Sequence, residues 1–400
     1  MISNTQHLLL GLLGAKLFSR KQPDVRNEDA LPVIKEAVQQ AVFLLVYPDL
    51  KDKLPERHRS KYRALYLSEL ASGIRNVSGH DELHRRMAKH RIPYVVIKGL
   101  ASASFYPQPA LRMSGDVDFL VRKKDIEKTK EILIAEGYTL GGNIKHPSHY
   151  AFYRDKETLE MHWQPNGVPE TAAGDLCRRY MSDILTTSQY YRKENVTCRV
   201  PDTFHHGWIL LIHTATHLID TGIGLRHFCD WAVFVSTLSD EEFRGIFEEK
   251  LKKVGLWHFA QILTALSTKY LGCPEKRWAA EAVDEKLLAA VMEDIFAAGN
   301  FGVKDKERIN EAKLMTTKGS GTVDGSNLAL QLLRALTEKA KIDLPICRKM
   351  IILLPVGWIY VIFHHIYLII QGRKPEIHIG KMVRGAGKRR EVYKEFRLYK

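Results

Sequence analysis

The chain has 400 residues and a mass of 45.8 kDa, more than one hydrophobic core usually covers, so we expect two or three packed units. Hydrophobic residues make up 45% and charged residues 26%, which excludes a mainly disordered chain, a collagen-like fibre and a polytopic membrane protein. The net charge is +14, and residues 372–400 hold ten Lys or Arg against three Glu. This basic tail favours a phosphate-bearing partner, with a solvated tail as the alternative.

The first 90 residues predict helices, because apolar residues recur at spacings of three and four within 37–46 and 61–74. The apolar run 8–13 has no basic residue before it and no clear cleavage pattern, so we expect a buried helix and not a signal peptide. The five cysteines stand far apart, without a CxxC pair, which suits a reducing compartment. We therefore expect a cytoplasmic protein.

Strands and short helices alternate after Pro93. The β-branched run 94–97 and the alternating run 116–121 predict two strands, and a helix is expected over 126–136. The runs 150–153 and 158–163 flank a polar turn and predict a hairpin. This alternation within about 70 residues indicates a small sheet domain.

Helical patterns return at about residue 202, and residues 318–327 are rich in Gly and Ser, which predicts a loop. We therefore predict an α+β fold, in which a small mixed-sheet core over 91–165 lies between an N-terminal helical segment (1–90) and a larger helical region with a basic tail (166–400). The expected helices of this last region cover 205–220, 225–238, 240–253, 257–270, 281–298 and 328–341.

The segment 350–370 has 21 residues without a formal charge, bracketed by basic residues on both sides. Its length could span a bilayer, but Pro355, His364 and His365 lie within it. We expect a buried core helix. The alternative is peripheral membrane contact through residues 350–400, with the basic tail beside the apolar segment.

Three carboxylates predict the chemistry. Asp116 and Asp118 are two residues apart on an expected strand, so both side chains leave the same face. Two like charges held together need compensation, and a divalent cation such as Mg²⁺ supplies it through hard oxygen ligands. Glu160 in the hairpin offers a third ligand, the minimum for a two-metal site. The alternative is that these are solvated residues of an exposed strand and hairpin.

At these residues the chain resembles the uncharacterised nucleotidyltransferase family within the DNA polymerase beta superfamily. The resemblance covers most of the chain after about residue 30. It rests on Ile97-Lys98-Gly99, Tyr106-Pro107, Leu111-Arg112-Met113-Ser114, Asp116-Val117-Asp118, Gly137-Tyr138, the histidines near 146–149, Glu160-Met161-His162-Trp163, His213, His217, Leu225-Arg226, Asp230-Trp231-Ala232, and Leu354-Pro355 followed by Trp358.

The resemblance implies a nucleotidyltransferase fold with a helical accessory region. It also implies metal ligation by Asp116, Asp118 and Glu160, and a loop after Gly99 that approaches the triphosphate. The wider superfamily usually has Gly-Ser at this loop, whereas here Leu100 follows the glycine.

The residues expected to hold the nucleotide are Lys98, Gly99, Ser102 and Arg112. Arginine presents a planar fork that matches phosphate oxygens, and lysine presents a compact charge. Each has a structural alternative: Lys98 as a surface lysine at a strand end, and Arg112 as an ion pair with Asp116 or Asp118.

Histidines form a further constellation. His213 and His217 lie one helical turn apart, but the spacing lacks the Glu of a zinc motif, and neither His227 nor Cys229 completes a ligand set. We expect packed helix histidines, or an acceptor side of the cleft. The residues of that acceptor side would be His162, His213, His217, Arg226 and Asp230, with His162 orienting the acid or acting as a base.

Together these features predict a nucleotidyltransferase that depends on Mg²⁺ (or Mn²⁺) and moves NMP from an NTP, such as ATP, to an unidentified acceptor by a two-metal mechanism. The alternatives are a non-catalytic nucleotide-binding protein and a membrane-surface interaction protein that keep the fold. Nucleic acid is not indicated as a partner, because aromatic and basic residues do not interleave.

Overall fold

The computed structural model describes residues 1–141, 148–164, 167–193, 195–280, 284–315, 323, 328–371 and 379–400. The predicted loop 318–327, apart from Val323, and His146 of the predicted histidine group lie outside these residues.

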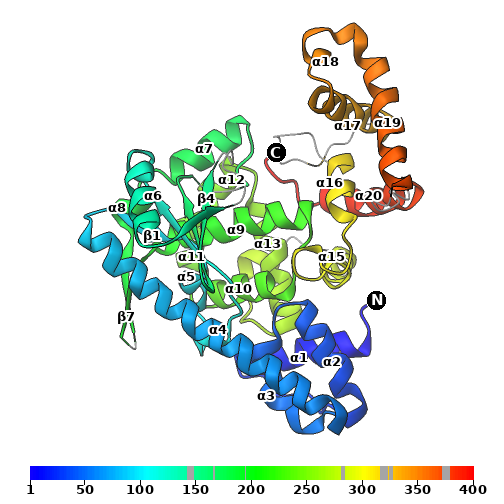
Figure 1. Cartoon of the computed structure of the whole chain (residues 1–400). Helices are drawn as coiled ribbons and strands as arrows, with labels where there is room; N and C mark the ends of the chain where they lie inside the picture. Colours follow the sequence, from blue (N-terminus) through cyan, green and yellow to red (C-terminus); the bar gives the residue numbers. More distant parts are fainter. Residues whose placement is uncertain are drawn as a thin grey trace.

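The N-terminal segment is helical, as predicted. The helix over the apolar run buries Leu9, Leu10, Leu12 and Leu13, which confirms a core role for that run. The longest helix of this segment runs diagonally from the sheet to the other N-terminal helices (Figure 1). The elements are α1 (Asn4–Phe18), α2 (Asn27–Gln39), α3 (Phe43–Leu50), the 3₁₀ turn Lys51–Lys53 and α4 (Glu56–Lys89).

Among the described residues, five strands form a mixed sheet in the order β1-β2-β5-β4-β3. Neighbouring strands are antiparallel except β2 and β5, which are parallel, and β4 and β5 form the predicted hairpin. The strands are β1 (Tyr94–Val96), β2 (Val117–Val121), β3 (Thr139–Gly141), β4 (His149–Arg154) and β5 (Glu157–His162), and the helices between them are α5 (Leu100–Ala103) and α6 (Ile126–Ala135), with 3₁₀ turns at Pro109–Leu111 and Lys123–Asp125.

The sheet divides two hydrophobic clusters, because successive side chains of a strand point to opposite faces. Val96 and Phe119 belong to a smaller cluster that includes Leu83 of α4. Val95 and Leu120 belong to a larger cluster, which joins the N-terminal helices to the C-terminal helices. Asp118 therefore shares the Leu120 face of β2 and points toward the larger helical part. The division of the chain into units 1–90, 91–165 and 166–400 stays a prediction.

Helices dominate the rest of the chain, but a two-stranded hairpin of β6 and β7 also occurs there, which the sequence reading missed. This hairpin joins the smaller cluster through the buried Cys198. The elements are α7 (Ala172–Tyr180), α8 (Ile184–Thr187), β6 (Gln189–Lys193), β7 (Val196–Val200), α9 (Thr203–Asp220), α10 (Leu225–Ser236), α11 (Asp240–Phe243), the π-helical Arg244–Glu248, α12 (Glu249–Lys253), α13 (Trp257–Leu266), the π-helical Ser267–Leu271, α14 (Arg277–Ala280), α15 (Glu285–Ala298), the 3₁₀ turn Asn300–Gly302, α16 (Arg308–Met315), α17 (Leu328–Asp343), α18 (Ile346–Lys349), the 3₁₀ turn Ile351–Leu353, α19 (Leu354–Ile370) and α20 (Ile379–Lys394).

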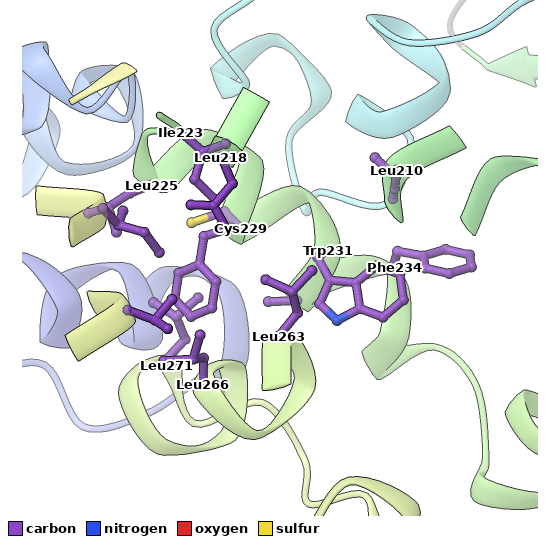
Figure 2. Packing of buried hydrophobic residues seen from close by; sticks show 14 of the residues in the cluster. Leu210, Leu218, Ile223, Leu225, Cys229, Trp231, Phe234, Leu263, Leu266 and Leu271 are labelled. Atoms are coloured by element: carbon purple, nitrogen blue, oxygen red, sulfur yellow. The ribbon is translucent and has the colours of Figure 1, made fainter. Parts of the chain in front are cut away.

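Two central helices form the middle of the larger cluster. Figure 2 shows Cys229, Trp231 and Phe234 of α10 beside leucines of α13. The buried Trp231 indole also donates a hydrogen bond to Thr264 Oγ1 at 3.0 Å, which satisfies its only polar atom. The predicted fold class, α+β with a small mixed sheet between helical segments, is confirmed.

The prediction of a buried core helix over 350–370 is wrong. Residues Ile351–Ile370 have a mean hydropathy of 1.8, yet only 11% of the most apolar window is buried. Within α19 only Gly357 and Val361 are buried. Apolar composition alone did not distinguish a buried helix from an exposed one.

The alternative of a solvated basic tail holds only in part for the described residues 379–400. Here α20 packs against α16, and the buried Arg389 pairs with Glu311 at 3.1 Å. Tyr393, Phe396 and Leu398 are buried in the larger cluster. Part of the basic charge at the C-terminus is therefore structural.

Gly207 allows α9 to approach α10 closely. A Cβ atom at this position would lie 2.6 Å from ring atoms of both Phe234 and Phe247. We expect Gly207→Ala to lower the free energy of unfolding by about 1–3 kcal/mol through overpacking. The matched control is Gly245→Ala, where a Cβ meets no atom within 4 Å. The control should gain roughly 0.5–1 kcal/mol from better helix propensity. Denaturant unfolding of both variants checks this, and equal effects would contradict the close contact.

Candidate active site

Three carboxylates meet at one edge of the β2–β5 pair. Asp118 on β2 is the direct register partner of Glu160 on β5, and Asp116 lies just before β2. One carboxylate oxygen from each residue lies within 4.8 Å of the others. The structure thus brings together the three acids that the strand pattern predicted. Parallel pairing places Asp118 and Glu160 side by side although they are 42 positions apart in the chain.

Asp118 is buried and held by a lysine and a histidine. Lys98 Nζ donates to its Oδ1 at 2.9 Å, and His162 Nε2 contacts the same oxygen at 2.9 Å. Burial alone would raise the pKa of Asp118, but Lys98 and His162 outweigh burial and hold that pKa well below its usual range. For His162, burial lowers the pKa, but hydrogen bonds to Asp118 and Glu160 outweigh burial and raise it. His162 therefore touches two of the acids, a geometry that favours the orienting role over the base.

Asp116 behaves differently from Asp118. Burial, together with the nearby charges of Asp118 and Glu160, raises the pKa of Asp116 to about 6. The pKa values of the two aspartates are thus shifted in opposite directions. Above pH 6 Asp116 is ionised as well, and its charge is repelled by Asp118 and Glu160.

The three carboxylates fit a hard divalent cation such as Mg²⁺ or Mn²⁺, because all offer oxygen donors and converge without a basic residue bound to Asp116. A second group, formed by His149, Glu160 and His162, also brings its ligand atoms within 4.8 Å. By contrast, among the described residues no such group contains His213, His217 or Cys229. The zinc alternative at these residues therefore has no support.

Two residues of α4 that sequence reasoning missed hold the loop at Gly99 and the start of β2. Gly99 has φ +53° and ψ −115°, and a Cβ there would lie 3.0 Å from His80 Nε2. Burial lowers the pKa of His80 to about 4, so its ring is neutral. Its Nδ1 donates to the Asn76 carbonyl at 2.6 Å, and its Nε2 accepts from the Leu100 N–H at 3.4 Å. The Asn76 amide donates to the Asp116 carbonyl at 2.8 Å. The only signal in the sequence was the spacing of four residues between Asn76 and His80, which places both on one face of a helix.

Arg112 has a different partner from the two that the sequence suggested. It makes a bidentate pair with Asp230, with both N–O distances at 2.7 Å, and Tyr106 donates to the same carboxylate at 2.8 Å. Burial lowers the pKa of Arg112, but Asp230 outweighs burial and raises it. Arg112 therefore ties the segment before β2 to α10, and the alternative of an ion pair with Asp116 or Asp118 is wrong.

Arg226, unlike Arg112, has no carboxylate partner among the described residues. In the described part of the chain it forms no ion pair; its Nη1 donates to the Met113 carbonyl at 3.0 Å, and its buried Nε has no hydrogen-bond partner. Burial and the nearby Arg112 lower the pKa of Arg226. A half-buried cation in this state favours an anionic ligand.

These groups line one cavity of about 770 Å³ between the sheet and helices α9 and α10. The three acids, Lys98, Arg112 and Arg226 all contribute to its wall. Ser102 also lines it, and its buried hydroxyl has no hydrogen-bond partner among the described residues. The cavity thus offers acids, cations and an unpaired hydroxyl to one ligand.

Neutral imidazoles form part of the cavity wall. His213 and His217 have ring centroids 4.3 Å apart, and His227 lies 5.4 Å from His213. Burial lowers the pKa of His217 to about 4 and holds the pKa values of His213 and His227 well below the ordinary value of 6.5. His227 has no hydrogen-bond partner among the described residues for either ring nitrogen, and Phe301 packs edge-on against its ring. Sequence reasoning predicted His213 and His217 here, while His227 and Phe301 were not assigned to this wall.

Comparison with known families decides the assignment. The model of a family described as uncharacterised nucleotidyltransferase matches residues 26–272. The chain belongs to this family. The match covers the N-terminal helices from α2 onward, the sheet, and the helices α9, α10 and α13. It therefore includes the three carboxylates Asp116, Asp118 and Glu160 and the two cations Lys98 and Arg226.

Solved structures give a weaker likeness. The antibiotic-resistance factor ANT(2'')-Ia is 11% identical with a TM-score of 0.31, over 46% of this chain and 91% of that one. A nucleotidyltransferase-like antigenic protein from Paracoccidioides brasiliensis is 15% identical with a TM-score of 0.34, over 54% and 97%. The search of curated proteins gives no match. The family match, and not these structures, carries the assignment.

The raised pKa of Asp116 predicts a metal response that depends on pH. Since the pKa in the folded state lies above the ordinary value of 3.8, protonation stabilises the fold at low pH, and this gain is lost as the pH rises through about 6. We expect Mg²⁺ to raise the melting temperature at pH 8 and to have little effect at pH 5. Thermal unfolding with and without Mg²⁺ at both pH values measures this.

Asp116→Asn is the matched variant for that measurement. It should abolish the Mg²⁺ response and stabilise the metal-free protein at pH 8 by on the order of 1 kcal/mol, because it removes the repulsion. A Mg²⁺ effect of equal size at pH 5 and pH 8 would contradict the assignment of the cluster.

Proposed function

We propose that the protein is a nucleotidyltransferase that uses Mg²⁺ or Mn²⁺ to move NMP from an NTP, such as ATP, to a hydroxyl acceptor. The observation that carries the proposal is the meeting of Asp116, Asp118 and Glu160 with Lys98 and the unpaired Arg226 in one cavity. Acids and cations that line the same cavity suit a metal-bound triphosphate. Family membership supports the same reaction class.

The three carboxylates would hold the cations. When bound, these cations would offset triphosphate charge and make the acceptor hydroxyl easier to deprotonate. In the transfer, the bond between the α-phosphorus and its bridging oxygen breaks, the acceptor oxygen bonds to that phosphorus, and pyrophosphate leaves. Glu160, which is partly exposed to the cavity, would accept the acceptor proton.

The cations of the wall would hold the triphosphate. Lys98 is 19% exposed and stands beside the acids, where its ammonium can contact phosphate oxygens. Arg226 supplies a guanidinium without a carboxylate partner among the described residues, and it takes the role first assigned to Arg112. Arg112 instead becomes a positioning residue, because Asp230 occupies its fork. Gly99 gives the loop its tight turn, and the free Ser102 hydroxyl can donate to a phosphate oxygen.

The acceptor would lie against His213, His217 and His227. Neutral imidazoles both donate and accept hydrogen bonds, which suits a hydroxyl-bearing molecule better than an anion. His162 would orient Asp118 and Glu160. A cytoplasmic location suits this function, and the five cysteines are all free.

A non-catalytic nucleotide-binding protein is the second candidate. One observation favours it: Leu100 replaces the usual Ser, and the Leu100 N–H already points to His80 instead of a ligand. This protein would bind the NTP but would release no pyrophosphate.

Binding and turnover separate the two candidates. Calorimetry with each of the four NTPs and Mg²⁺ should show binding to the native protein, and pyrophosphate release with a panel of hydroxyl acceptors should follow. The double variant Asp116→Asn/Asp118→Asn should lose metal-dependent binding, because the cation ligands are gone. Binding without pyrophosphate release would favour the non-catalytic candidate, and no binding to any NTP would refute both.

The role of Arg226 predicts a loss of nucleotide affinity. We expect Arg226→Gln to weaken NTP binding about tenfold to a hundredfold, the amount expected when a charged hydrogen bond to phosphate is lost. Arg178→Gln is the matched control, since Arg178 lines the same cavity but is paired with Asp175 at 2.6 Å. Calorimetry measures both affinities, and equal losses would contradict the special role of Arg226.

A further inference from the structure

The helix that was expected in the core presents a broad apolar surface instead. We define the apolar face as the exposed hydrophobic side chains of Ile351–Ile370. Its most exposed members are Ile352 at 81%, Ile370 at 79% and Ile351 at 71%. A contiguous exposed surface of this kind marks a contact with another phase or molecule. The full set is Ile351, Ile352, Val356, Ile359, Tyr360, Ile362, Phe363, Ile366, Tyr367 and Ile370.

The opposite side of α19 is packed, so the exposure does not come from an unattached helix. A Cβ at Gly357 would lie 2.9 Å from Ala340 Cβ, so this glycine brings α19 close to α17. Trp358 Nε1 donates to Thr337 Oγ1 of α17 at 3.0 Å. Helices α17 and α19 thus form a hairpin with one packed side and one apolar side, and this hairpin projects from the body of the molecule (Figure 1).

Basic residues flank the apolar segment in the sequence. Residues 344–375 contain no Asp or Glu, and Arg348-Lys349 and Arg373-Lys374 bracket the apolar segment. Next in the chain, α20 exposes Arg384, Lys388 and Lys394. Positive charge beside an apolar surface complements the anionic headgroups and acyl chains of a lipid surface.

The charge pattern also disfavours a second copy of this chain as the occupant. Both ends of the apolar segment are basic, so two copies that pack face to face bring like charges together in either orientation. Tyr360 and Tyr367 on the face are residues that favour a membrane–water interface.

The packing of α17 distinguishes insertion in the plane of the membrane from spanning. Helix α17 carries the ion pairs Lys339–Asp343 and Lys341–Glu338 and packs along α19. A spanning α19 would draw these charges into hydrocarbon or lose its packing, and both are costly. Insertion of the apolar face alone leaves α17 in water.

We propose that the α17–α19 hairpin is a peripheral membrane anchor, which inserts its apolar face into an anionic bilayer while the cavity stays in water. The anchor uses no residue of the carboxylate cluster and is independent of the proposed function.

Vesicle flotation of the full chain tests the anchor. The protein should float with vesicles of phosphatidylcholine containing about one-third phosphatidylglycerol, and less with phosphatidylcholine alone, because basic residues add attraction to anionic lipid. Ile359→Glu/Ile366→Glu should lower the floating fraction at least about tenfold by placing charge in the acyl region. The matched control is Leu67→Glu/Ile74→Glu on α4, at the same seven-residue spacing and with both side chains 54% exposed.

Each outcome is decisive. Flotation that the α19 variant loses and the α4 control keeps supports the anchor. No flotation with either vesicle, or equal flotation of the α19 variant, overturns it. A concentration-dependent dimer in sedimentation, lost in the α19 variant and accompanied by no flotation, overturns it in favour of self-association. Nucleotide binding measured in parallel should be unchanged in both variants, so failure of the anchor and failure of the proposed function are distinguishable.

Discussion

The neutralisation of Asp118 is the constraint on which the site depends. The strand pairing that brings Asp118 beside Glu160 also buries Asp118 on the helical side of the sheet, where an unpaired charge is very costly. Lys98 from the end of β1 and His162 from β5 both contact one of its oxygens. Three neighbouring strands thus contribute to one charge-balanced group, and the sheet order β1-β2-β5 is the arrangement that allows it.

A second buried ion pair sets where the helical region lies relative to the sheet. Arg112 and Tyr106 both contact Asp230, so the segment between β1 and β2 is tied to α10. The same helix carries Arg226 and His227 into the cavity. Removing one partner of such a pair leaves a buried charge, which is why we assign Arg112 a positioning role. The ion pair between Arg112 and Asp230 therefore joins the sheet side of the cavity to α10, in addition to apolar packing.

The sequence predicted features that depend on short spacing and missed those that depend on distant contacts. Alternation on a strand placed Asp116 and Asp118 correctly, and the hairpin pattern placed Glu160 near them. The partner of Arg112 lies 118 positions away, and His80 lies on a helix that precedes the sheet, so no local period could reveal either. The prediction of a buried helix over 350–370 was wrong for another reason. Hydropathy measures the affinity of a segment for apolar surroundings, but it does not show whether the rest of the fold provides those surroundings.

The basic charge at the C-terminus has two separate uses. Arg389 is buried, and it pairs with Glu311 and donates to the carbonyls of Leu218 and Ile219 at the end of α9. It therefore braces the helix that carries His213 and His217. Arg384, Lys388 and Lys394 on the same helix remain exposed. One helix thus supports the wall of the cavity with its buried side and keeps its charge in water on the other. Because the buried arginine is already paired with Glu311, only the exposed residues can contribute to attraction toward an anionic surface.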